Sequence, residues 1–436
     1  MSQLQTNDTI FLQDGSSVTV NKLLGAGGQG EVYLVQDQNG NKYALKWYTA
    51  ANIKEDNSFR NNLDNNIKRG APTKNFLWPL KLTQKHKGSY GYLMNLRPDR
   101  FHDIIEMTCI KRYPNSYFRN AECKINAALQ ICDAFRNLHI RGFSYQDLNE
   151  GGFLVDFSNG DVLICDNDNV VANGGNLGVR GKVRYMAPEV VAGEKPTIQS
   201  DCLSLALILY RIFMIDHPLE GALTLQYPNM TPEIERALFG KNAVFCYDPV
   251  NTTNRPVPGQ DINSIKFWKM ITPDLRGMFQ KALGQEALHN PEKRVKVKEW
   301  KDFFINLRNK LVVCPAEGRD KPDFFFMTDK TPVECPKCKH RITPSANLIF
   351  QDGTVCDVYR HKNIYIGDAF KPVAYGVSRK KDDGTEEIAV KNISQDNWVL
   401  VTASKRTIQV LPGSAVPLKN GMNLHFNGAI SCNVKV

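Results

Sequence analysis

The chain has 436 residues, of which 42% are hydrophobic and 23% charged, so it holds enough apolar material for a buried core and is not a largely disordered protein. Its 55 Lys and Arg against 45 Asp and Glu give a net charge of +10 that is spread in short runs, which speaks against a nucleic-acid-binding protein. There is no leader-like N-terminus and no apolar run of membrane-spanning length, so we expect a cytoplasmic protein whose 11 cysteines are mostly reduced thiols.

Residues 10–95 are predicted to form a small β-rich lobe. Phe59, Leu63 and Ile67 follow one another at helical spacing, which predicts a helix over 59–69. Apolar alternation and a short apolar run predict strands at 18–24, 32–35 and 43–47.

Residues 96–312 are predicted to form a larger helical lobe. A β-rich lobe followed by an α-rich lobe indicates an α+β bilobal fold. Helical spacing is clearest in two sets of apolar residues: Ile125, Leu129, Cys132, Phe135 and Leu138, and Leu203, Leu207, Tyr210 and Met214.

The character of the chain changes after residue 312. Residues 313–345 read as a short, proline-punctuated linker, and residues 346–436 as a small all-β sandwich domain. Asn427-Gly428 favours a hairpin between the last two strands, because Asn-Gly readily adopts positive φ at both turn positions. Strand signals occur at 388–390, 398–401, 407–411 and 422–426.

The first chemical signal is a glycine-rich loop. Gly25, Gly27, Gly30 and Val32 fit the pattern G-x-G-x-x-G-x-V between two predicted strands. Glycines let backbone amides approach phosphate groups closely. A dinucleotide site needs a helix directly after the glycines, and here a strand follows, so a lid over phosphates is favoured. Lys46 lies downstream in an apolar strand and is predicted to contact those phosphates; the alternative is a surface lysine on an edge strand.

Acidic residues follow at ordered separations. Asp147 lies in the segment 143–149, and Asp166 lies 19 residues later, after the apolar run 162–165. Several such signals in one order are far more specific than any single motif. The remaining signals are Glu189 in the run 185–189, Asp201 at the head of an apolar helix, and Arg294.

The order of these motifs over residues 18–310 resembles a eukaryotic-type protein kinase domain. The resemblance implies that Lys46 contacts the α- and β-phosphates of ATP and that Asp147 orients the acceptor hydroxyl and receives its proton. It implies that Asp166 holds Mg²⁺ or Mn²⁺, that Glu189 pairs with Arg294, and that Asp201 braces the catalytic loop. The nucleotide-binding residues that it implies are Gly25, Gly27, Gly30, Val32, Ala44, Lys46, Asp64, Met94, Asn95, Leu96, Asn149 and Leu154.

Within that nucleotide set, the resemblance implies separate tasks. Ala44 and Leu154 enclose the adenine, Met94 is the gatekeeper, and Asn95 begins the hinge. Kinases pair the phosphate-binding lysine with a helix glutamate, and Asp64 is the acid that the predicted helix 59–69 offers for this role.

The catalytic loop departs from the family. Tyr145-Gln146 stands where kinases have His-Arg, which removes the usual partner of an activation-loop phosphate. The segment 169–186 contains no Ser or Thr. These two absences agree, so we expect an activity that is not switched by activation-loop Ser/Thr phosphorylation.

The metal-binding positions also depart from the family. Gly152 stands where kinases keep a metal-binding Asn, and Asn149 replaces the usual Lys. We expect Asp168 or Asn149 to supply the missing metal ligand and Lys182 to restore positive charge beside Asp147. The alternative is that Asp168 is a turn residue and Lys182 a solvated loop charge.

Other segments narrow the resemblance. The runs 76–80, 166–170 and 217–221 look like those of a bacterial kinase group associated with tellurite-resistance and von Willebrand A-type proteins. That group often occurs beside a metal-dependent protein phosphatase. The resemblance therefore implies a von Willebrand A-type protein and such a phosphatase as partners.

The linker carries cysteines at metal-binding spacing. Cys335 and Cys338 form a C-x-x-C knuckle, and Cys314 precedes them, which predicts a zinc-ribbon-like site of three sulfurs. The fourth ligand is left open among Glu317, Asp320 and His340, and the alternative is a decayed ribbon without metal. The β-rich tail resembles a forkhead-associated domain in strand rhythm but lacks its phosphothreonine-reading residues, so we expect a protein-interaction domain.

Together, the sequence predicts an ATP-dependent Ser/Thr protein kinase with a C-terminal interaction domain. The main alternative is a pseudokinase that binds nucleotide and acts as a scaffold. A further alternative is transfer of another group from ATP, such as AMP.

Overall fold

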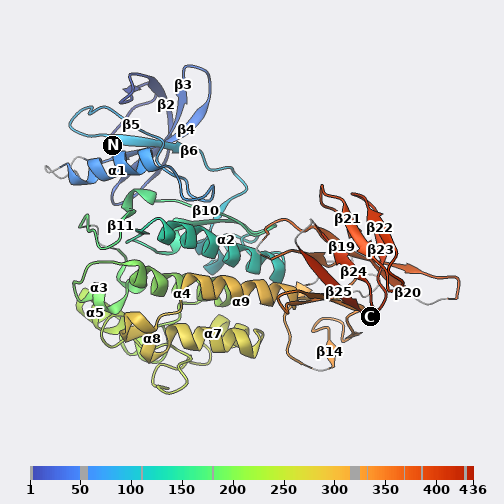
Figure 1. Ribbon diagram of the computed structural model, residues 1–436. Helices are drawn as coiled ribbons and strands as arrows, with labels where there is room; N and C mark the ends of the chain where they lie inside the picture. The colour runs from blue at the N-terminus through green and yellow to red at the C-terminus, as the bar shows by residue number, and fades with distance from the viewer. Residues whose placement is uncertain are drawn as a thin grey trace.

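A computed structural model describes residues 3–49, 57–109, 111–178, 181–314, 325–330, 332–367, 369–383, 386–426 and 430–436. A sheet with one helix lies above a body of helices, and a strand-rich tail lies to the side of that body (Figure 1). We call these parts the N-lobe, the C-lobe and the tail.

The N-lobe is an antiparallel sheet with strand order β1-β2-β3-β4-β6-β5, and it bears the helix α1 (Ser58–Arg69). The predicted helix and the three predicted strands of this region are confirmed. Leu63 of α1 is buried in the cluster that also holds Ala44 and Met94, so one face of the sheet packs against the helix. The strands are β1 (Thr9–Phe11), β2 (Ser17–Ala26), β3 (Gly30–Asp37), β4 (Lys42–Tyr48), β5 (Lys81–Leu82) and β6 (Gly91–Asn95).

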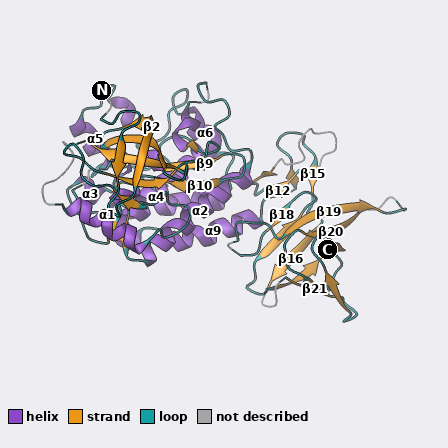
Figure 2. Ribbon diagram, turned by 90° about the horizontal axis from the view of Figure 1, so that it is seen from above, coloured by secondary structure: helices purple, strands orange, loops and turns teal. Residues whose placement is uncertain are grey.

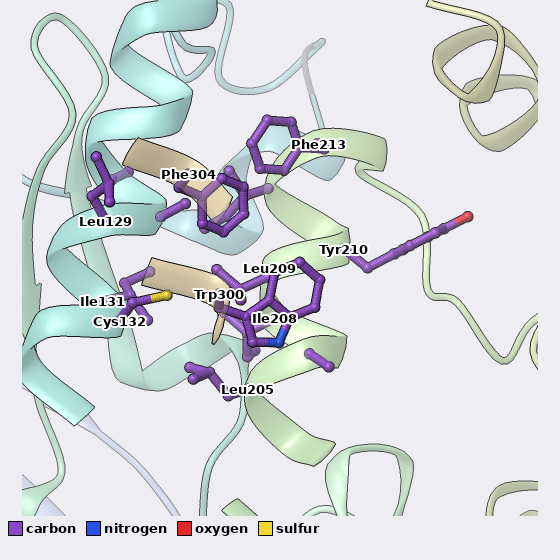
Figure 3. Packing of buried hydrophobic residues seen from close by; sticks show 14 of the residues in the cluster. Leu129, Ile131, Cys132, Leu205, Ile208, Leu209, Tyr210, Phe213, Trp300 and Phe304 are labelled. Atoms are coloured by element: carbon purple, nitrogen blue, oxygen red, sulfur yellow. The ribbon is translucent and has the colours of Figure 1, made fainter. Parts of the chain in front are cut away.

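The C-lobe is built around three long helices, α2 (Ala121–Ile140), α4 (Ile198–Met214) and α9 (Val297–Asn309). Figure 3 shows their apolar side chains meeting, with the Phe213 ring of α4 stacked on the Phe304 ring of α9 at 5.6 Å between centroids. Among the described helices, none combines the length and apolar character needed to cross a membrane. The shorter helices are α3 (Pro188–Val191), α5 (Pro232–Phe239), α6 (Ile262–Trp268), α7 (Pro273–Leu283) and α8 (Gln285–His289).

Short strands of the C-lobe carry the loops that face the N-lobe. β9 (Phe153–Asp156) pairs with β10 (Asp161–Ile164) and with β7 (His102–Asp103), and β8 (Phe143–Ser144) pairs with β11 (Val171–Ala172). The segment between β8 and β9 and the segment between β10 and β11 therefore lie together below the N-lobe sheet.

The linker contains two small antiparallel pairs. β12 (Val312–Val313) pairs with β13 (Phe325–Phe326), and β14 (Val333–Glu334) pairs with β15 (Arg341–Ile342). The second pair is the hairpin that carries the C-x-x-C knuckle at its tip.

The tail consists of two sheets that enclose one apolar core, with strand orders β17-β16-β25-β24-β21-β22 and β18-β19-β20-β23. The predicted all-β sandwich is thus confirmed. β24 and β25 pair antiparallel as expected, although the Asn427-Gly428 turn lies outside the described residues. The strands are β16 (Ala346–Phe350), β17 (Val355–Val358), β18 (Asn363–Ile364), β19 (Ala374–Lys380), β20 (Glu386–Asn392), β21 (Trp398–Val401), β22 (Thr407–Val410), β23 (Ala415–Pro417), β24 (Asn423–His425) and β25 (Ser431–Lys435).

A buried polar seam joins the tail to the C-lobe. The carboxylate of Glu122, at the start of α2, accepts hydrogen bonds from Tyr365 (3.0 Å) and Asn363 (3.2 Å) of the tail. The guanidinium of Arg308 in α9 lies 4.0 Å from the centre of the Tyr365 ring, and Lys362 donates to the backbone carbonyl at the end of α9 at 2.5 Å. Figure 2 shows the tail lying beyond one end of α2 and α9, where these contacts form.

Candidate active site

The glycine-rich loop is a tight connection between β2 and β3. The N–H of Gly27 donates to the carbonyl of Gly30 at 2.8 Å, which closes the turn. A Cβ on Gly30 would lie 2.1 Å from the backbone oxygen of Trp47, so this position requires glycine for β3 to pair with β4. A Cβ on Gly25 or Gly27 would meet nothing within 4 Å, so nothing crowds the backbone at these two glycines. We call the region between this loop and the segment after β10 the cleft; Gln29 of the loop donates to Asn169 of that segment at 3.5 Å.

Lys46 lies at the centre of a buried charge cluster. Its ammonium contacts Asp168 at 2.8 Å and Asp166 at 3.2 Å, and it donates to the side-chain oxygen of Gln29 at 3.0 Å. Only 5% of Lys46 is exposed, and burial alone would lower its pKa. The two carboxylates outweigh that effect and raise the pKa of Lys46, so the lysine is a cation in the cleft.

The expectation that Asp64 pairs with Lys46 is wrong. Asp64 forms an ion pair with Lys68, one turn further along α1, at 2.6 Å. This pair lies on the solvent side of the helix, with 69% of the Lys68 side chain exposed, because α1 turns its apolar face and not its acid toward the sheet.

Asp168 also differs from its expected role as a metal ligand. Its side chain is fully buried, and both of its oxygens are engaged, by Lys46 and by the hydroxyl of Tyr48 at 2.7 Å. These contacts make Asp168 a partner of the lysine, and the full burial of its side chain keeps both oxygens away from solvent.

Asp166 has the properties expected of the metal-binding carboxylate. It adopts left-handed backbone geometry at φ 57°, which is uncommon for a non-glycine residue and is found at active sites. Half of its side chain is exposed, at 50%, while the other side faces Lys46. A carboxylate oxygen that is open to solvent beside a buried lysine is a suitable ligand for a hard cation such as Mg²⁺ or Mn²⁺.

Asp147 sits in the loop between β8 and β9 with Asn149 and Lys182 beside it. The amide of Asn149 donates to Asp147 at 3.0 Å, while its oxygen accepts from the N–H of Gly151. An amide oxygen has a second lone pair, so metal binding by Asn149 stays a prediction. Burial raises the pKa of Asp147, and the bonds from Asn149 and from the backbone of Lys182 oppose that rise.

The buried Asp201 of α4 braces this loop. Its carboxylate accepts the N–H of Tyr145 at 2.7 Å and contacts His139 at 3.1 Å. The Tyr145 hydroxyl donates to the carbonyl of Cys165, directly before Asp166, and so links the two acidic loops. A Cβ on Gly152 would lie 3.6 Å from that hydroxyl, an ordinary contact, so the backbone here does not require a glycine.

The residues expected around adenine come together. Ala44 and Met94 are direct neighbours on β4 and β6, and Leu154 of β9 packs in the same buried cluster. Val32 of β3 and Leu96, in the segment after β6, pack against this cluster. Asn95 ends β6 with its side chain exposed, at the start of the connection between the lobes.

Glu189 and Arg294 form a bidentate ion pair beneath the activation segment. The two guanidinium nitrogens of Arg294 lie 2.6 and 2.7 Å from the Glu189 oxygens. Only 2% of the Arg294 side chain is exposed.

The linker brings three cysteines to one point. The sulfurs of Cys314, Cys335 and Cys338 lie within 4.8 Å of one another. Among the described residues, these three cysteines form the group that could hold a metal ion. Burial raises the pKa of Cys335, but N–H donors from Cys338 and Lys337 outweigh it and bring this pKa to about 7. Glu317 and Asp320, two of the suggested fourth ligands, lie outside the described residues, and His340 is not part of the group.

The sequence patterns do not identify two residues that contact the charge cluster, Gln29 and Tyr48. Gln29 is a variable position of the glycine pattern, and Tyr48 reads as the apolar end of a strand. A polar residue two positions from Lys46 on β4 was the available signal for Tyr48, because residues i and i+2 share one face of a strand.

Part of this chain is similar to known proteins, both to a family model and to a solved structure. A family model described as protein kinase domain matches residues 18–299. Among solved structures, a double-mutant form of the Mycobacterium tuberculosis PknI kinase domain is similar over 69% of this chain and 97% of that chain, with 19% identity and a TM-score of 0.46. The family match runs through both lobes and ends within α9, before the linker.

Proposed function

Because this chain belongs to the protein kinase family, we propose that it is an ATP-dependent kinase that phosphorylates Ser or Thr hydroxyls of a protein. The divalent metal and ATP that the family uses supply the phosphoryl group and neutralise its charge. The chain's own residues bind, orient and accept a proton. Lys46 binds phosphate oxygens, Asp166 provides the metal-facing carboxylate, and Asp147 orients the acceptor hydroxyl and takes its proton.

One observation carries the proposal. Lys46 and Asp166 are 120 positions apart in sequence, yet their side chains are 3.2 Å apart in the cleft. Asp147 is close enough that the Asp166 charge contributes to its raised pKa. A lysine and two carboxylates held together in this way supply the positioning and charge that phosphoryl transfer needs.

Lys182 supports the Ser/Thr assignment. Ser/Thr kinases place a lysine near the γ-phosphate, and here Asn149 occupies that sequence position. The Lys182 ammonium lies 3.5 Å from Glu150 with 55% of its side chain exposed, and its charge acts on Asp147. Lys182 therefore offers the catalytic loop a cation from the activation segment.

A specific observation also favours the pseudokinase. The position after the catalytic loop that usually carries a metal ligand is Gly152, and the oxygens of Asp168 are both engaged. With one open carboxylate, Asp166, the cleft can bind nucleotide without completing transfer.

The two candidates are separated by labelled-ATP assays of the full chain with Mg²⁺ and with Mn²⁺. We expect transfer of the γ-label to a protein hydroxyl and a loss of at least about 100-fold in Asp147→Asn, the range for removing a general base. Asp64→Asn is the matched control, an acid outside the cleft, and is expected to match wild type. Nucleotide binding without transfer by the wild type would establish the pseudokinase, and transfer of an α-label would establish the AMP-transferring alternative.

We further propose that the activation segment needs no phosphate. The side chain of Gln146, where kinases carry the phosphate-binding Arg, donates to the carbonyl of Gly175 at 2.7 Å. Ser204 holds the segment at its other end by donating to the carbonyl of Tyr185 at 2.6 Å. Mass spectrometry of active protein is expected to find this segment unmodified; a stoichiometric phosphate required for activity would contradict the proposal.

We propose zinc for the cysteine group. Three thiolates at this spacing, two of them on a knuckle whose N–H groups stabilise negative charge, match a structural zinc site. Metal analysis of freshly purified protein is expected to give about one zinc per chain, and Cys335→Ser to lose it. Purified wild type without zinc would show that the ribbon has decayed.

A further inference from the structure

Among the described residues, the charge partners of Lys46 come from one loop. The carboxylates of Asp166 and Asp168 both belong to the segment between β10 and β11. Among the described residues, no acidic side chain of α1 forms an ion pair with Lys46. The helix instead contacts the same segment through the amides of Asn62 and Asn66, which both donate to the Val170 carbonyl at 2.8 Å.

Asp168 is built to hold the lysine. It lies in the short 3-10 turn Asn167–Asn169, which Asn167 anchors by donating to the carbonyl of Ile164 at 2.9 Å. Tyr48, two residues from Lys46 on β4, donates to Asp168 Oδ2 at 2.7 Å and is itself buried. Lys46 and Tyr48 therefore both contact the Asp168 carboxylate from the same face of β4.

There is a physical reason for Lys46 to have Asp168 as a second carboxylate partner beside Asp166. A lysine that is 5% exposed is strongly destabilising without a counter-charge. Asp166 is half-exposed and is the residue suited to the metal, so its charge is shared when nucleotide and metal bind. Asp168 is fully buried and keeps Lys46 neutralised and aimed in both situations.

We propose that Asp168 is the positioning residue for Lys46, in the place of the helix glutamate, and that the lysine's ion pair therefore needs no acidic side chain from α1. The inference rests on the proposed nucleotide site and deepens it. It removes one mode of regulation from this chain: an acid on α1 does not make or break the ion pair that aligns the phosphate-binding lysine.

The first test needs no nucleotide. A double-mutant cycle of Lys46→Met and Asp168→Asn on the full chain reports their coupling in thermal unfolding. We expect Asp168→Asn to lower the midpoint by several degrees in the wild-type background, on the order of what breaking a buried pair costs, and by far less in the Lys46→Met background. Additive effects of the two substitutions would overturn the inference.

The second test measures binding of a non-hydrolysable ATP analogue with Mg²⁺ by calorimetry. We expect Asp168→Asn to weaken affinity by about 10-fold or more, the effect of about 1.4 kcal/mol, and Tyr48→Phe to weaken it in the same direction by less. Asp64→Asn, the matched acid on α1, is expected to bind like wild type. Equal affinity of Asp168→Asn and wild type, or a loss in Asp64→Asn, would overturn the inference.

The two proposals fail separately. Wild type without phosphoryl transfer contradicts the kinase, while the coupling of Lys46 and Asp168 stands on measurements made without turnover. Transfer by a wild type in which the cycle is additive contradicts the positioning role alone.

Discussion

Glu189 neutralises a buried guanidinium, and we expect Glu189→Ala to destabilise the C-lobe strongly. All five N–H donors of Arg294 are in use: two face Glu189, and three face the backbone carbonyls of Ala287, Leu288 and Gln199. The substitution removes two charge-assisted bonds and leaves a positive charge that is almost fully buried.

The expected magnitude follows from this count. Hydrogen bonds to charged groups contribute about 1.5–3 kcal/mol each, and breaking a buried pair costs about 3–5 kcal/mol. The three carbonyl bonds that remain favour the lower end, about 3 kcal/mol. At about 2–4 °C per kcal/mol for a domain of this size, the unfolding midpoint falls by roughly 6–12 °C.

Differential scanning calorimetry of the full chain measures this shift. The control is Asp302→Ala, which breaks the exposed pair between Lys298 and Asp302, whose side chains are 70% and 53% exposed. Exposed pairs within a helix contribute about 0.3–0.5 kcal/mol, so the control shifts the midpoint by about 1–2 °C. If Glu189→Ala shifts the midpoint no more than the control does, the assignment of a buried, charge-balancing pair is refuted.

Three further predictions follow from single contacts. Gly30→Ala forces a Cβ against a β4 carbonyl and is expected to destabilise the N-lobe by about 1–3 kcal/mol in thermal unfolding. Gly27→Ala, whose Cβ meets nothing within 4 Å, is expected to leave the unfolding midpoint unchanged. Equal midpoints for the two variants would contradict this prediction. Burial holds the pKa of His217 well below 6.5, so below that pH the unfolded chain binds an extra proton and the free energy of unfolding falls by about 1.4 kcal/mol per pH unit. Denaturant titrations at pH 5.5 to 7.5 are expected to lose this slope in His217→Gln, and an unchanged slope would refute it. Tyr365→Phe removes a bond to the buried Glu122 carboxylate and is expected to lower the free energy of unfolding by about 1–3 kcal/mol in the same titrations. A value equal to wild type would show that this bond does not stabilise the protein.

The sequence was sufficient where a motif fixes both residue type and spacing. Lys46, Asp147 and Asp166 were singled out this way, and the structure brings the side chains of Lys46 and Asp166 within 3.2 Å of each other. The strands on either side of the glycine-rich loop follow from alternation. The buried helices of the C-lobe follow from apolar spacing. The strand rhythm also identified the sandwich, although not which strands share a sheet, because alternation carries no information on pairing partners.

The sequence was insufficient where a role depends on the direction in which a side chain faces within the fold. Asp64 and Asp168 are both acids near Lys46 on plausible elements, and their sequence positions cannot decide which one faces inward. The phase of α1 points Asp64 to solvent, and the left-handed residue Asp166 turns the following residues so that Asp168 is buried. Neither effect is visible in a periodic pattern.

The seam between the tail and the C-lobe has a consequence for any protein that binds the sandwich. Glu122, Arg308 and Lys362 are buried within it, so the sandwich is not a module that swings on a loose tether. For a protein bound to the sandwich, the gain in effective concentration at the cleft depends on whether the protein can span the fixed separation between the sandwich and the cleft. A protein that binds the sandwich therefore gains effective concentration at the cleft only if it is long enough to span that separation.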